Sequence, residues 1–384
     1  MNESQSVARA AALGDRLAAR AERTEAERRM LPETLADLRA AGLLRLFQPR
    51  RYGGAEAPLT EATAVISTLA RACGSTAWVA SVYTDHSVLL GKFDPLAADE
   101  VWGSTPDALI SAGYMPSGSV ERVPGGWQIA GTWGFASGCD HADWLLLGSL
   151  LPDATGVPTP SLCLVSRKEV EIEDNWHVLG LCGTGSKNIR VDGVHVPVHR
   201  TLALTDANGD RVPNGRTVTP LYQLPHVSTV PFMFSATGLG IAESLLDAMI
   251  ASIKQTQSRG QRLADIQALQ IHVAESAAEI DCARQLLERD TAQAMAAVEA
   301  GRSLTLKEKI RNRRDQAYMV KLCRSAVDRL FAAAGSRGLF ESHVAQRKFR
   351  DMCAMSTHAA LGWDIAATSW GRVAFGLDPG TPFI

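Results

Sequence analysis

The chain has 384 residues, of which 46% are hydrophobic and 21% are charged, and such values are ordinary for a globular protein with a packed core. The formal net charge of -2 argues against general binding to nucleic acid or to an anionic membrane surface. The seven cysteines contain no CxxC pair and are odd in number, which argues against a disulfide framework and against a zinc site.

The first 29 residues are rich in alanine, arginine and glutamate and contain no continuous apolar run, so we expect no secretory signal. No stretch approaches the ~18–20 apolar residues that a membrane span needs. We therefore expect a cytoplasmic protein that binds neither membrane nor nucleic acid.

Residues 1–104 are expected to form a helical domain. Pro32 lies at the start of one apolar helix, where its missing N–H costs nothing. A second helix is expected from Leu59 to Ala72. Ser75 is expected to be the N-cap of a third helix that continues through Leu90.

Residues 105–205 are expected to form a β domain, because short alternating runs replace the helical pattern there. The segments 127–133 and 189–196 alternate apolar and polar residues, and Gly125-Gly126 is typical of a hairpin turn. Residues 206–384 return to helical periodicity after a loop at 206–225. Four amphipathic segments, at about 229–257, 262–299, 304–334 and 339–375, predict a four-helix bundle, so the fold class is α+β.

This order of domains is similar to that of the acyl-CoA dehydrogenase superfamily. The segments that carry the resemblance occur in the same order over nearly the whole chain: residues 127–138 (WQIAGTWGFASG), 180–197 (GLCGTGSKNIRVDGVHVP), 266–270 (IQALQ), 335–338 (GSRG) and 347–351 (RKFRD). The resemblance implies an acyl-CoA-dehydrogenase-like fold with flavin at a junction between domains.

One departure from the dehydrogenase pattern changes the expected function. Many acyl-CoA dehydrogenases have a catalytic glutamate about eight residues after the Arg-Asp signature, whereas residues 352–360 here read MCAMSTHAA and contain no carboxylate. A histidine in this stretch resembles the oxygenase component of two-component flavin monooxygenases, such as the hydroxyphenylacetate and steroid-ring phenol hydroxylases. The resemblance implies that a separate reductase supplies reduced FAD, with FMN as the alternative. A flavin C4a-hydroperoxide formed with molecular oxygen would then hydroxylate a small phenol or indole-like molecule.

Three residues are expected to be catalytic. The resemblance places the Ser137 hydroxyl toward flavin N5, where it would protect the oxygenated flavin. The resemblance also includes a histidine at a position like that of His86, and it implies that His86 takes a proton from the substrate, a role that suits imidazole because it titrates near neutral pH. His358 is expected to hydrogen-bond the oxygenated flavin or the substrate. The substrate pocket is expected between the helix around His86 and residues 205–230.

The expected cofactor contacts form two groups. The isoalloxazine ring would lie against Trp133, Phe135, Ser137, Gly138 and Trp176. The flavin phosphates would meet Arg259, Gly335, Ser336 and Arg337. The histidines form no HxH or HExxH arrangement, so no metal is expected.

Three alternatives stay open from the sequence: an acyl-CoA dehydrogenase with a displaced base, a flavin monooxygenase that oxygenates nitrogen or sulfur, and a scaffold without enzymatic activity. The family resemblance also implies a homotetramer, in which a neighbouring subunit completes each flavin site.

Overall fold

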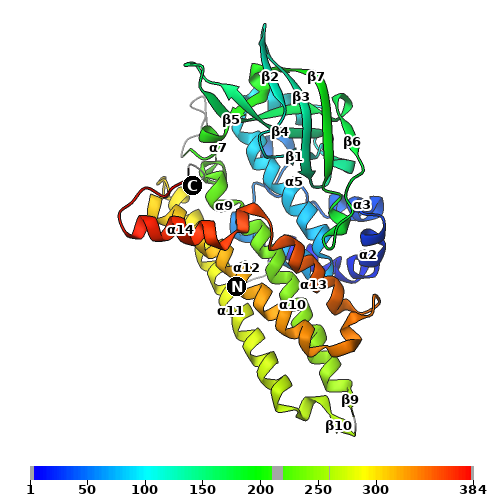
Figure 1. Ribbon diagram of the computed structural model, residues 1–384. Coiled ribbons are helices and arrows are strands. Elements are labelled where there is room, and N and C mark those ends of the chain that lie inside the picture. Colours follow the sequence, from blue (N-terminus) through cyan, green and yellow to red (C-terminus); the bar gives the residue numbers. More distant parts are fainter. Residues whose placement is uncertain (1–3, 210–218, 259, 382–384) are drawn as a thin grey trace.

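The computed structural model describes residues 4–209, 219–258 and 260–381. The strands between residues 110 and 203 gather at one end of the molecule, and the long C-terminal helices extend away from them (Figure 1). A short strand pair at residues 257–258 and 261–262 lies at the opposite end. Helix α5 (Gly74–Lys92) runs between these two parts, in contact with β1 (Ile110–Gly113) on one side and α10 (Pro231–Gln255) on the other. This central helix carries several of the candidate site residues.

The N-terminal part consists of six helices, which are α1 (Gln5–Ala12), α2 (Gly14–Ala26), α3 (Pro32–Ala40), α4 (Leu59–Ala72), α5 and α6 (Pro95–Trp102). The predicted starts at Pro32 and Leu59 are confirmed. The predicted N-cap is wrong, because Cys73 precedes α5 and Ser75 lies buried inside its first turn. Helix α5 is apolar on nearly every side because other elements cover it all round.

The central part consists of two four-stranded sheets. One has the order β1-β4-β5-β8 and the other β2-β3-β7-β6. The remaining strands are β2 (Ser119–Val123), β3 (Gly126–Ala136), β4 (Trp144–Pro152), β5 (Pro158–Ser166), β6 (Glu171–Glu173), β7 (Lys187–Pro197) and β8 (Thr201–Ala203). Side chains of β3, β4, β5 and β7 share one apolar core. The predicted hairpin turn is confirmed, since Val123 pairs with Gly126 and Gly125 has φ 80°.

The C-terminal part begins with the short helices α7 (Leu204–Ala207), α8 (Pro220–Gln223) and α9 (His226–Thr229). The long helices α10, α11 (Gln267–Glu299) and α12 (Leu306–Ala333) follow, with the short strands β9 (Gln257–Ser258) and β10 (Gln261–Arg262) between α10 and α11. These three helices match the first three predicted segments. The chain ends with α13 (Val344–Met355) and α14 (Trp363–Ala374).

The prediction of one helix over residues 339–375 is wrong, because a connection separates α13 from α14. The hydroxyls of Ser356 and Thr357 donate to the carbonyls of Cys353 and Ala354, so side chains end the helix. His358 therefore lies in a connection between helices and not on a long helix.

One segment, His226–Gln255, is long and apolar enough to cross a membrane by length and composition, and 56% of its most apolar window is buried inside the fold. Within this segment, α10 packs against α4, α11 and α12. Its apolar character therefore corresponds to the position of a central core helix.

Candidate active site

Ser137 lies in a tight turn at the end of β3. The pairing of β3 with β7 is irregular between Trp133 and Ala136, and Phe135 has φ 60°. Gly138 follows with φ 74°, and a Cβ there would lie 2.6 Å from the hydroxyl oxygen of Tyr83, so the position requires glycine. The Gly138 N–H donates to the carbonyl of Thr184 at 2.8 Å. These contacts fix the Ser137 side chain in a buried position facing α5.

A chain of hydroxyl groups determines where the Ser137 proton points. Thr184 Oγ1 donates its proton to the carbonyl of Leu181 at 2.8 Å. Toward Ser186 Oγ, 2.7 Å away, Thr184 Oγ1 can therefore only accept, so Ser186 donates its proton to Thr184. Ser186 Oγ in turn lies 2.7 Å from Ser137 Oγ and can only accept. Since Trp78 Nε1 also donates to Ser137 Oγ at 3.2 Å, the Ser137 oxygen has only a lone pair left for a ligand.

His358 lies beside Trp78, the indole that donates to Ser137, although it is distant from both in the sequence. Its ring is edge-on to Trp78 with centroids 5.3 Å apart, and it is 5.0 Å from the Phe234 ring, which itself stacks on Trp78. Its Nδ1 accepts from the Ala360 N–H at 3.2 Å, so Nε2 carries the proton of the neutral ring. Burial, with Arg313 nearby, lowers the pKa of His358 to about 4. His358 is thus a neutral hydrogen-bond donor at neutral pH.

His86 is buried on α5 and presents a lone pair. Its Nδ1 lies 2.8 Å from the Ile110 carbonyl, which can only accept, so Nδ1 carries the proton and Nε2 has the lone pair. Burial lowers the pKa of His86, which keeps the imidazole neutral at neutral pH. Ser111, which follows Ile110 on β1, donates a hydrogen bond from its hydroxyl to the Ser137 carbonyl at 2.8 Å. Strand β1 therefore connects His86 to Ser137.

The predicted aromatic residues have different environments. Phe135 is 78% exposed and meets Trp176 edge-to-face, with ring centroids 6.0 Å apart. The exposed ring of Phe135, two residues before Ser137, and the partly exposed ring of Trp176 beside it offer aromatic surface to a flat flavin ring. Trp133, in contrast, is 1% exposed and donates from Nε1 to the Gly148 carbonyl at 2.6 Å. It is enclosed in the core between the two sheets, so its role in this chain is packing.

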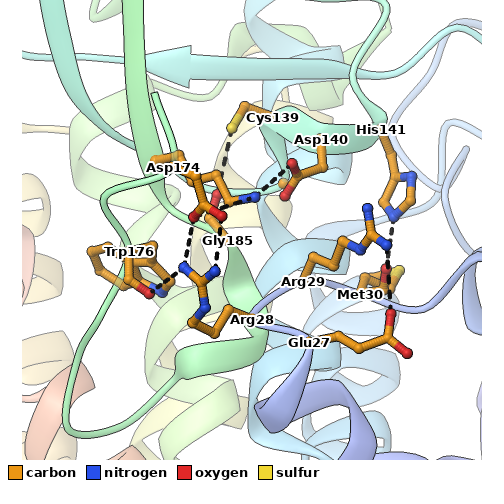
Figure 2. Close-up of polar contacts among 12 residues, drawn as sticks. Glu27, Arg28, Arg29, Met30, Cys139, Asp140, His141, Asp174, Trp176 and Gly185 are labelled. Atoms are coloured by element: carbon orange, nitrogen blue, oxygen red, sulfur yellow. Dashed lines mark hydrogen bonds and ion pairs between the residues drawn. The ribbon is translucent and has the colours of Figure 1, made fainter. Parts of the chain in front are cut away.

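An ionic network ties the segment that carries Trp176 to the N-terminal helices, as Figure 2 shows. Arg28 donates to both carboxylate oxygens of Asp174, at 2.6 and 2.8 Å, and its Nη1 lies 3.5 Å from the Trp176 carbonyl. Lys187 donates to Asp140 at 2.8 Å and lies 3.7 Å from Asp174. The network holds the Trp176 segment against the turn that follows Ser137.

Arg350 and Asp351, the Arg-Asp signature on α13, bind the loop that follows Trp176. The Asp351 carboxylate accepts from the Leu181 N–H at 2.7 Å, and Arg350 Nη1 donates to the Leu179 carbonyl at 2.8 Å. Burial raises the pKa of Asp351 to about 6. These contacts give the signature a structural role in positioning the loop after Trp176.

The residues expected at the flavin phosphates lie apart from this group. Gly335, Ser336 and Arg337 are exposed on the short helix between α12 and α13. No hydrogen bond within the described ranges links them to Ser137, His86 or His358. Arg259 lies outside the described residues.

Comparison with family models matches residues 4–93 to the acyl-CoA dehydrogenase N-terminal domain and residues 232–363 to the acyl-CoA dehydrogenase C-terminal domain. The oxygenase component of FADH(2)-dependent resorcinol hydroxylase from Rhizobium sp. (strain MTP-10005) is 36% identical over 386 residues, covering 97% of this chain and 94% of that protein.

Two solved structures are similar over the whole chain. The 3-HSA hydroxylase of Rhodococcus sp. RHA1 superimposes with a TM-score of 0.95 at 31% identity, covering 100% of both chains. XiaF from Streptomyces sp., in complex with FADH2 and glycerol, gives a TM-score of 0.93 at 27% identity, covering 98% of this chain and 96% of that one.

The helical, strand and helical parts in this order define an acyl-CoA dehydrogenase fold. Within that superfamily, the chain belongs to the oxygenase components of flavin-dependent monooxygenases. The protein is thus an oxidoreductase that depends on reduced flavin, and a dehydrogenase with a displaced base, a nitrogen or sulfur oxygenase and a non-enzymatic scaffold are not favoured.

Proposed function

We propose that the chain hydroxylates a small phenol with molecular oxygen and with reduced FAD that a separate reductase delivers. The observation that carries this proposal is the oriented hydroxyl chain at Ser137. Reduced flavin has a proton on N5, whereas oxidised flavin has a lone pair there. A Ser137 oxygen whose own proton is directed to Ser186 fits the reduced form.

Ser137, Gly138, Phe135 and Trp176 would hold the flavin ring at the junction of the sheets and α5. When bound, reduced flavin supplies the two electrons that activate oxygen, and one oxygen atom leaves as water. The buried surroundings of Ser137 exclude water, which keeps activated oxygen from being lost as hydrogen peroxide.

His86 would act as the general base toward the substrate. Its Nε2 lone pair can accept the phenol proton, which increases the electron density of the ring and favours attack on an electrophilic oxygen. His358 would donate its Nε2 proton within the same site, next to Trp78. The two imidazoles are held in opposite roles, one as acceptor and one as donor, by the backbone groups that engage their Nδ1 atoms.

Assembly belongs to the same proposal. The exposed Gly335, Ser336 and Arg337 would meet the flavin phosphates of a neighbouring subunit in a homotetramer, and Leu339 and Phe340 beside them are exposed apolar residues that suit an interface. The proposed domain boundary at residues 104/105 lies between α6 and β1, and the proposed boundary at 205/206 lies within the short helix α7, just after the last strand of the central part. The seven unpaired cysteines fit a reducing compartment such as the cytoplasm.

The test combines the protein with photochemically reduced FAD under anaerobic conditions, followed by ¹⁸O₂ and a panel of phenols and indoles. We expect a product that gains one ¹⁸O atom, detected by mass spectrometry. Reduction of protein-bound oxidised flavin by an acyl-CoA, with no oxygen-labelled product, would contradict the proposal.

A further inference from the structure

A second polar group lies beside His86 and takes no part in the roles assigned above. Asp85, the preceding residue on α5, lies with Oδ2 3.1 Å from Nε2 of His226 on α9. The His226 ring stacks on Tyr114, which follows β1, with centroids 5.9 Å apart and an interplanar angle of 14°. Three elements that are distant in sequence therefore bring a carboxylate, an imidazole and a phenol together.

Each member of this group has a buried polar atom with no hydrogen-bond partner among the described residues. These atoms are Asp85 Oδ1, Tyr114 OH and His226 Nδ1. The Asp85 and His226 residues are 2% and 5% exposed. Buried polar atoms are usually paired, and three unpaired ones in a single group indicate a place for a polar ligand atom.

The group lies next to the proposed base. The Asp85 carboxylate lies close enough to act on the pKa of both neighbours: it opposes the lowering of the His86 pKa by burial and adds to the raised pKa of Tyr114. Strand β1 supplies the carbonyl of Ile110 to His86 and continues directly into Tyr114. A substrate that gives its proton to His86 would thus lie within reach of the group.

The chemistry of these atoms selects the ligand group. Asp85 Oδ1 requires a hydrogen-bond donor, whereas the Tyr114 hydroxyl can donate or accept. A substrate hydroxyl can donate to Asp85 and accept from Tyr114 at the same time. A substrate carboxylate would instead face the carboxylate of Asp85, and no arginine or lysine within residues 4–209, 219–258 and 260–381 is hydrogen-bonded to this group.

We propose that Asp85, Tyr114 and His226 bind a second hydroxyl of the substrate, so that the substrate is a dihydroxylated aromatic ring without an acidic side chain. This inference rests on the proposed function, because it assumes that a phenol occupies the site beside His86. The group determines which phenol binds, and His86 remains the base.

The test is an anaerobic equilibrium titration of the protein loaded with reduced FAD, which measures substrate affinity without turnover. The probes are phenol, 1,3- and 1,4-dihydroxybenzene and 3-hydroxybenzoate. We expect a dihydroxybenzene to bind at least tenfold more tightly than phenol, and 3-hydroxybenzoate to bind more weakly than phenol. Equal affinities for phenol and both dihydroxybenzenes would overturn the inference, and would show that water alone pairs with these atoms.

Two conservative variants sharpen the assignment. Tyr114→Phe keeps the stacked ring and removes only the hydroxyl, and Asp85→Asn removes the charge. Both are expected to bring the dihydroxybenzene-to-phenol affinity ratio close to one while phenol affinity stays within about twofold. Asp85→Asn should also increase 3-hydroxybenzoate affinity relative to phenol.

The matched control is Tyr222→Phe, which removes a buried tyrosine hydroxyl that donates to the Phe47 carbonyl outside this group. The dihydroxybenzene-to-phenol affinity ratio of Tyr222→Phe should equal that of the parent. An unchanged ratio in both Tyr114→Phe and Asp85→Asn would overturn the inference even if both variants oxygenate phenols. Failure of the parent protein to bind reduced FAD would refute the proposed function instead, so the two failures are distinguishable.

Discussion

Trp78 Nε1 donates a hydrogen bond to Ser137 Oγ over 3.2 Å, and this bond links helix α5 to the turn at the end of β3. The same indole stacks on Phe234 of α10 at 4.6 Å. One side chain thereby fixes the position of the serine against both helical parts of the molecule. A change at Trp78 should affect the reaction of oxygen at the site more than it affects folding.

Trp78→Phe tests this relationship, because phenylalanine keeps the stacking partner for Phe234 and removes the N–H. Loss of one buried hydrogen bond is worth about 1 kcal/mol, so we expect roughly a fivefold rise in the ratio of hydrogen peroxide to hydroxylated product. The ratio is measured by peroxide assay and chromatography in the same reaction. Unchanged coupling in a variant that still binds reduced FAD would show that the bond has no part in protecting activated oxygen.

The hydroxyl chain predicts selectivity between the two forms of the cofactor. Ser186→Ala removes the group that receives the Ser137 proton, so that Ser137 becomes free to donate. We expect the preference for reduced over oxidised FAD to fall about tenfold, measured by anaerobic and aerobic titrations. Ser161→Ala is the control, since Ser161 is a buried serine on β5 whose hydroxyl donates to the Thr159 carbonyl, outside the chain. An equal change in both variants would contradict the assignment.

Helical periodicity was sufficient to predict the order of the three parts and most of the long helices, because an amphipathic stripe repeats over many turns. It failed at residues 356–362, where local hydroxyl contacts from Ser356 and Thr357 end α13 within a stretch whose composition still suits a helix. Side-chain capping of this kind depends on rotamers, and spacing alone carries little information about it.

The candidate site was predictable only where a motif carries it. Ser137 and His358 were proposed from family motifs, and the structure places His358 beside Trp78, which donates a hydrogen bond to Ser137. Trp78 and Asp85 were missed, because one looks like an ordinary core residue of an apolar helix and the other gains its meaning from His226, which is distant in sequence. The GTGS stretch at 183–186 places two hydroxyl residues, Thr184 and Ser186, close together in the sequence, which was a signal of a hydroxyl pair. The partners of these hydroxyls depend on the fold, so the sequence alone could not identify them.

The protonation state of His86 predicts the pH dependence of hydroxylation. The base must be neutral to accept a proton, so activity is lost as the pH falls through the His86 pKa, which burial places below its ordinary value of 6.5. We expect single-turnover hydroxylation to be constant from pH 7 upward and to decline only below pH 6.5. His86→Gln should reduce the rate by roughly 10²- to 10⁴-fold and should abolish this acid limb. An acid limb that persists unchanged in the variant would assign it to another group.

The network in Figure 2 predicts a modest effect on cofactor affinity. Arg28→Ala and Asp174→Ala each remove one side of the bidentate pair that holds the Trp176 segment, so each should weaken reduced FAD binding a few-fold. The double variant should lose less affinity than the sum of the two single losses, because both changes remove the shared Arg28–Asp174 pair. Each residue also makes a contact of its own, Arg28 with the Trp176 carbonyl and Asp174 with Lys187. Arg302→Ala is the control, since Arg302 makes the same bidentate contact with Glu308, outside this network at the start of α12. Additive losses in the double variant would contradict the network.

The lowered pKa of His358 predicts that the protein loses stability as the pH falls. Its pKa of about 4 in the folded protein lies below the ordinary value of 6.5, so between these values the unfolded chain binds more protons than the folded one. Stability therefore rises with pH in that window and falls on acidification, by about 2 kcal/mol between pH 7 and pH 5 for this one group. His358→Gln, which does not titrate, should lose correspondingly less stability than the parent over the same interval in urea unfolding. His195→Gln, at an exposed strand position on β7, is the control and should follow the parent. Equal losses in the parent and in His358→Gln would show that the fold does not lower the pKa of this imidazole.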